Sequence, residues 1–157
     1  GKQKAETLIP QIMLLTVLNH PNIYSYVADE FHRLEMGESE LEALYHTTID
    51  ILETNLGEEE EPLDRDTLLT QIKAIGKEGI LTEFLSRDRL LVHAGFARPA
   101  QPEDVVVEGW KSLWNQWARS MLQAELMAAR LALVRDMTEE NESRMLALKR
   151  AADENGQ

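Results

Sequence analysis

The stretch from Glu103 to Arg135 constrains the fold more than any other part of the chain. It contains no proline and a single glycine, Gly109. Large apolar side chains recur in it at the spacing of one helical face; they are Trp110, Trp114, Trp117 and Met121. The pattern predicts one continuous helix, roughly 50 Å long at 1.5 Å per residue.

A second helical segment follows this stretch and runs almost to the C-terminus. The two are separated by a break at Asp136-Met137-Thr138, and the hydroxyl of Thr138 is well placed to cap the second helix. The sequence therefore predicts a terminal helical hairpin. A hairpin of this length has more surface than a small domain needs to close its core, which suggests a docking element.

The two halves of the long helix differ in side-chain size. The tryptophan-rich first half can bury large areas, so we expect it to anchor the helix to the rest of the chain. The slimmer second half allows a partner helix to approach closely. We expect Met145 and Leu148 to pair with Leu131 and Val134 inside the hairpin. Leu146 lies about 100° around the helix from Met145 and is expected to stay exposed.

The residues before the long helix predict an all-α bundle with no strand. Five helices are expected there, over residues 8–18, 23–34, 40–55, 67–75 and 80–91, which makes seven in the whole chain. The predicted organisation is a helical bundle subdomain over residues 1–101, followed by the long helix and C-terminal helical hairpin over residues 102–157. Thr7, Ser39 with Glu42, and Asp64 or Asp66 are the expected helix caps. The expected inward faces include Ile12, Leu15, Tyr26, Phe31, Leu44, Ile72, Ile75 and Phe84.

Charge and composition exclude several classes of function. The net charge is −12, and residues 1–62 alone hold thirteen acids and three bases. An acidic surface repels phosphate backbones, so we expect no direct binding to nucleic acid. No apolar run is long enough to span a membrane. Four consecutive glutamates, Glu58 to Glu61, are expected to form a solvated loop before Pro62.

No pattern in the sequence indicates catalysis. The glycine-rich loops that bind nucleotide phosphates are missing. Without cysteine there can be no thiolate nucleophile or cysteine-based zinc site, and the four histidines lack the spacing of a helical metal site. His20, before Pro21, is expected to act at a helix end. We therefore expect no catalytic residues, no metal and no cofactor.

Several segments resemble the C-terminal domain of DnaG-type bacterial primases. The run from Leu14 to Pro21, followed by Ile23, resembles the leucine-rich helix and His-Pro break with which those domains open. The Gly109-Trp110 pair and the long helix resemble the tail of alphaproteobacterial members, as do the segments 138–141 and 146–150. The resemblance covers about residues 7 to 155.

This resemblance implies a bundle and hairpin that dock primase onto a DnaB-type replicative helicase hexamer during DNA replication. Primer synthesis by the nucleotidyltransferase core would then belong to another part of a longer parent chain, in the bacterial cytoplasm. A first residue other than methionine, Gly1, agrees with that expectation. Apolar anchors and rim charges on the hairpin are the expected helicase-binding residues, namely Val134, Met137, Arg144, Met145, Leu146, Leu148, Lys149 and Arg150.

Two other interpretations remain open. The bundle also resembles the N-terminal domain of the helicase itself, which would associate into dimers or trimers, whereas a docking module is expected to be a monomer or a domain-exchanged dimer. A small all-helical enzyme or ligand-binding bundle would instead place a buried polar cluster near His46 or His93.

Overall fold

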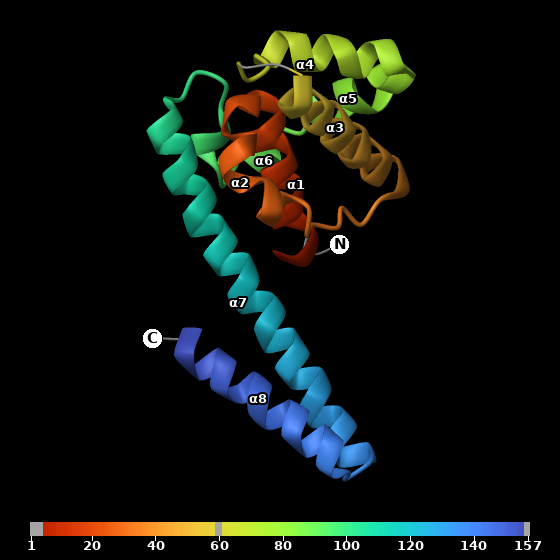
Figure 1. The fold of residues 1–157 in the computed structure, drawn as a ribbon, viewed down its shortest axis with the longest axis vertical. Coiled ribbons are helices and arrows are strands. Elements are labelled where there is room, and N and C mark those ends of the chain that lie inside the picture. Colours follow the sequence, from red (N-terminus) through yellow and green to blue (C-terminus); the bar gives the residue numbers. More distant parts are fainter. Residues whose placement is uncertain (1–4, 59–60, 156–157) are drawn as a thin grey trace. The chain divides into compact units, whose positions relative to one another are not determined.

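The computed structural model describes residues 5–58 and 61–155, and within these ranges the chain forms helices and no strand (Figure 1). The predicted all-α fold is therefore confirmed. In chain order the helices are α1 (Ala5–Asn19), α2 (Tyr24–Phe31), α3 (Ser39–Glu58), α4 (Arg65–Ile72), α5 (Glu78–Leu85), α6 (Arg89–Val92), α7 (Glu103–Arg135) and α8 (Glu139–Asn155). Short 3-10 turns cover Pro21–Ile23 and Gly95–Ala97, and a π-helical segment covers Lys73–Lys77.

The chain divides into two compact units, and the boundary lies inside α7, between Ser112 and Leu113. The sequence placed the division earlier, between residues 101 and 102. The first turns of α7 belong with the bundle because Val106 and Trp110 are fully buried. The Trp110 ring lies 6.2 Å from that of Phe31, and its Nε1 donates a hydrogen bond of 2.7 Å to Glu30.

Helix α1 forms the centre of the first unit. Every residue from Ile9 to Pro21 is buried, so this helix has no solvent-facing side over most of its length. Its buried polar groups bond within the helix or to distant segments of the first unit, and Asn19 also accepts a hydrogen bond of 2.9 Å from Arg65 on α4. Asn19 donates to the carbonyl of Ala97, and His20 Nε2 lies 2.8 Å from the carbonyl oxygen of Arg98. His20 thus lies at a helix end, but its side chain caps no helix and instead contacts the segment before α7.

Local signals predicted helix positions better than helix ends. Asp64 caps α4 by accepting a hydrogen bond of 2.7 Å from the amide of Thr67. Helix α1 begins at Ala5, so Thr7 lies inside it and is not its cap. The predicted capping box at Ser39 is wrong, because Glu42 reaches past Ser39 to accept from the Met36 amide at 2.6 Å. The single helix expected over residues 80–91 is divided into α5 and α6.

Two residues predicted to face the core are exposed. Tyr26 on α2 is 69% exposed, and Ile75 in the π-helical segment is 56% exposed. The segment changes direction at Gly76, which has a φ of 96°, a left-handed conformation that glycine adopts without strain. The π-helical segment has more residues per turn than α4 and changes direction at its end. Ile75 is therefore no longer in line with the buried face of α4.

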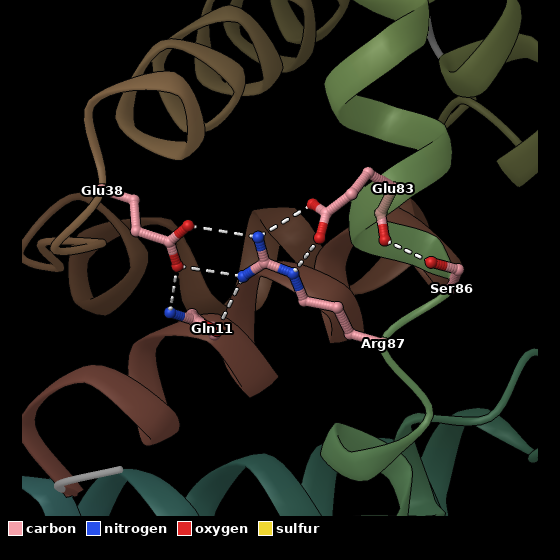
Figure 2. Close-up of polar contacts among 5 residues, drawn as sticks. All are labelled: Gln11, Glu38, Glu83, Ser86 and Arg87. Carbon is pink, nitrogen blue, oxygen red and sulfur yellow. Dashed lines mark hydrogen bonds and ion pairs between the residues drawn. The ribbon is translucent and has the colours of Figure 1, made fainter. Parts of the chain in front are cut away.

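A cluster around Arg87 joins three parts of the first unit (Figure 2). Arg87 comes just after α5 in the chain. Its guanidinium lies 2.8 Å from the carboxylate of Glu83 on α5 and 3.0 Å from that of Glu38, in the loop between α2 and α3. Gln11 of α1 bridges Arg87 and Glu38, because its side-chain amide accepts a hydrogen bond from Arg87 and donates one to Glu38. Hydrogen bonds from Arg87 hold the pKa of Glu38 below its ordinary value, so this carboxylate stays charged in mildly acidic solution.

Candidate partner-binding surface

The second half of α7 carries apolar residues on two opposite faces. One face holds Leu122, Leu126, Ala129 and Leu133, at the i, i+4, i+7, i+11 positions of a single stripe. Leu126 and Ala129 on this face are buried, with 4% and 1% exposure. This is the covered face of α7 within the second unit.

The opposite face of α7 is uncovered. Met127, Leu131 and Val134 follow one another at i, i+4, i+7 and are 57%, 53% and 79% exposed. Met137, in the turn that follows, is 83% exposed. We call these four residues the outer stripe. Leu131 and Val134 were predicted to lie inside the hairpin, and that prediction is wrong because the stripe at Leu126 and Ala129 occupies the covered side.

Helix α8 folds back along the second half of α7 (Figure 1). Its inward stripe is as predicted: Met145 and Leu148 are half-buried and Ala152 is buried. Leu146 is 42% exposed, which confirms that it lies off this stripe. Two of the predicted partner-binding residues, Met145 and Leu148, are thus only partly accessible, whereas Arg144, Lys149 and Arg150 are exposed.

The turn between α7 and α8 is fixed by hydrogen bonds. The hydroxyl of Thr138 accepts from the amide of Asn141 at 3.1 Å, which confirms Thr138 as the cap of α8. The side chain of Asn141 reaches back to the carbonyl of Asp136 at 2.8 Å. Glu139 and Glu140 lie in the first turn of α8, where negative charge is favourable. These contacts hold the end of the hairpin, and with it Val134 and Met137, in one conformation.

The three tryptophans of α7 are divided between the two units. Trp110 is packed in the bundle, as expected of an anchor. Trp114 and Trp117 belong to the second unit, where their rings lie 5.0 Å apart. Aromatic pairs at this separation add to the apolar burial of each ring.

Several titratable groups of the first unit form structural contacts. Tyr24 donates to Glu53, and His32 Nε2 lies 3.0 Å from the same carboxylate, which ties α2 to α3. The hydrogen bond from Tyr24 holds the pKa of Glu53 below its ordinary value. His46 is exposed and lies 3.3 Å from Glu42 on the same helix. Among the described residues no group of three or more acids and histidines is arranged to hold a metal ion.

None of the helices in the described ranges is both long and apolar enough to cross a membrane. Comparison of the chain with protein-family models, with curated proteins and with solved structures finds no match in any of the three. Functional inference for this chain therefore rests on its own residues. Four of the five large apolar side chains that are exposed in the described part of the second unit belong to the outer stripe.

Proposed function

We propose that this chain is the helicase-docking module of a DnaG-type bacterial primase, and that it has no chemistry of its own. The observation that carries the proposal is the outer stripe, a continuous apolar face left uncovered on α7. Soluble chains rarely leave aligned large apolar side chains exposed on one helix unless another molecule covers them.

The geometry of the stripe suits helix-in-groove recognition. Residues at i, i+4 and i+7 are the anchors that such complexes insert into an apolar groove. Met127, Leu131 and Val134 have this spacing. Methionine adapts its shape to irregular pockets, which suits the two ends of the stripe, at Met127 and Met137. Leu146 and the exposed cations Arg144, Lys149 and Arg150 on α8 would form the rim and affect association rate and specificity.

The choice of partner follows from the sequence resemblance. A DnaB-type hexamer presents repeated copies of one binding surface, so several modules can occupy one ring. Such binding would raise the local concentration of primase at the replication fork. The exposure of His46 and His93 favours a docking module over a ligand-binding bundle, which would bury polar groups around them.

The proposal is tested by co-elution of the chain with a DnaB-type helicase hexamer in size-exclusion chromatography. The key variant is Leu131→Glu with Val134→Glu. Both positions are exposed, and glutamate is a good helix former, so α7 should remain folded. We expect the variant to bind at least about tenfold more weakly, because two central anchors are lost.

The matched control is Thr70→Glu with Thr82→Glu. This pair adds the same charge to exposed positions of α4 and α5 in the first unit, and leaves the outer stripe and α8 unchanged. The control should bind like the parent chain. Equal binding by the outer-stripe variant and the parent would contradict the docking role of the stripe. Light scattering of the chain alone addresses the helicase-domain alternative, which requires stable dimers or trimers.

A further inference from the structure

Two adjoining hollows lie on the first unit, beside the C-terminal half of α3. The larger, about 570 Å³, lies between α3 and α4 and includes Asp50, Ile51, Asp64 and Ile75 in its lining. The smaller, about 270 Å³, lies on the α2 side and includes Leu52 and Leu56. They share one wall, formed by Asn55, Glu61, Pro62 and Leu63. We call the pair the α3–α4 groove.

Apolar side chains at both ends of the α3–α4 groove are exposed. Leu56 is 47% exposed in the smaller hollow, and Ile75 is 56% exposed in the larger one. Leu63 lies in the wall between them and is half-buried. Two large apolar side chains on either side of a shared wall form a surface that gains stability when another apolar group covers it.

The charged groups that line the groove are all acidic. Asp50, Glu61 and Asp64 contribute carboxylates to the larger hollow, and no lysine or arginine among the described residues lines either hollow. The hydrogen bond from the Thr67 amide lowers the pKa of Asp64, so its carboxylate stays charged further into acidic solution than an ordinary aspartate. The surrounding sequence reinforces this field, since residues 1–62 have a net charge of −10.

The three carboxylates are not equally free to bind a cation. One oxygen of Asp64 accepts the capping hydrogen bond from the Thr67 amide, so this carboxylate is already engaged at the start of α4. Asp50 and Glu61 are exposed, and within the described ranges neither carboxylate caps a helix. Thr54 and Gln71, also in the lining, provide neutral hydrogen-bonding groups beside them.

We propose that the α3–α4 groove binds a basic, partly apolar peptide segment of a partner protein. An aliphatic side chain of that segment would cover Leu63 and Ile75, and an adjacent arginine or lysine would pair with Asp50 and Glu61. Charge complementarity selects this occupant, because an acidic or phosphorylated segment would be repelled. This gives a role to Glu61, at the end of the glutamate run. The site belongs to the first unit, so it stands independently of the docking proposal for the outer stripe.

The test uses the full chain labelled with ¹⁵N and a peptide of defined composition. The probe is a pentapeptide with one leucine between two arginines, flanked by glycines. We expect saturable amide shifts confined to residues 50–56, 61–67 and 71–75. Asp50→Asn with Glu61→Gln should weaken binding about tenfold, and Ile75→Ala should weaken it about threefold.

Matched controls separate the groove from the general acidity of the chain. Glu35→Gln with Glu40→Gln removes the same charge from exposed positions, and Val92→Ala removes a 74% exposed apolar side chain. Both should leave binding unchanged. Weakening by the charge control equal to that of the groove variant would overturn the proposal, as would equal binding of a peptide with glutamines in place of the arginines. Magnesium chloride that produced the same localised shifts at matched ionic strength would also overturn it, in favour of a simple cation site.

Discussion

The ring of Phe96 lies directly over the backbone of Gly109, so close that a Cβ at residue 109 would lie 2.1 Å from its Cγ. Gly109 is the only glycine in α7, and glycine inside a helix costs about 1 kcal/mol relative to alanine. The close approach explains why the helix carries glycine at this position. It also fixes the segment Gly95–Ala97 against the first turns of α7.

Gly109→Ala is therefore expected to destabilise the first unit, although alanine is the better helix former. Three atoms of the Phe96 ring lie within 2.6 Å of the added Cβ position, so the ring or the helix must shift. Overpacking of this kind typically costs about 1–3 kcal/mol, which exceeds the gain in helix propensity. Urea unfolding, followed by circular dichroism, measures the change.

The companion experiment introduces Gly109→Ala into a Phe96→Ala background. With the ring removed, the three atoms nearest the new methyl group are gone, and the substitution should stabilise the chain by about 0.5–1 kcal/mol. The sign of the effect should thus reverse between the two backgrounds. The same sign in both would show that the Phe96 contact is not what requires glycine.

Arg87→Ala is expected to lower the free energy of unfolding of the first unit by about 1–2 kcal/mol. The side chain of Arg87 is only 12% exposed and holds Glu38 and Glu83 together with Gln11. The stranded carboxylates remain about half exposed and can hydrate, which limits the loss. Arg89→Ala, at an exposed neighbouring position, is the control and should change stability by less than about 0.5 kcal/mol.

Stability should depend on pH through Glu38. Its pKa is lowered in the folded chain by hydrogen bonds from Arg87, so the unfolded chain binds the proton more readily. This contribution is present above the ordinary glutamate pKa of about 4.3 and is lost as the pH falls below it. We expect Glu38→Gln to be less stable than the parent by about 0.5–1 kcal/mol at pH 7. The difference should shrink between pH 5 and pH 3 in urea titrations; a constant difference would contradict this.

Thr138→Ala should destabilise the start of α8 by about 1 kcal/mol, the usual cost of losing a helix cap. The Thr138 hydroxyl accepts a hydrogen bond from the Asn141 amide, and this amide loses its partner in the variant. Hydrogen exchange at the Asn141 amide should accelerate several-fold in the variant. Thr138→Ser keeps the hydroxyl and should exchange like the parent; equally fast exchange in Thr138→Ser would assign the effect to the lost methyl group.

Local chemistry made part of this fold predictable from the sequence. The continuity of α7 and the cap of α8 at Thr138 depend on near neighbours in the chain, and both were predicted correctly. The cap of α4 is Asp64, one of the two candidates that the sequence offered. The Arg87 cluster could not be found in the same way. Glu83 is four residues from Arg87, but Glu38 and Gln11 are 49 and 76 residues away, and no local pattern indicates that Arg87 would meet them.

The candidate surface shows a different limit of sequence reasoning. Periodicity identifies apolar faces, but it does not say which of two faces a neighbour will cover. In α7 the stripes through Leu126 and Leu131 both have helical spacing, and only packing against the rest of the unit distinguishes them. Met127 was missed for this reason. The signal that could have identified it is its position four residues before Leu131 and seven before Val134.

The two-sided character of α7 has a consequence for the lifetime of the protein in a cell. If the outer stripe binds a partner as proposed, an unbound copy displays the kind of exposed apolar surface by which chaperones and proteases recognise damaged chains. Unbound copies would then be degraded and bound copies would not. The amount of the protein would follow the number of available binding sites on the partner, without a dedicated regulator.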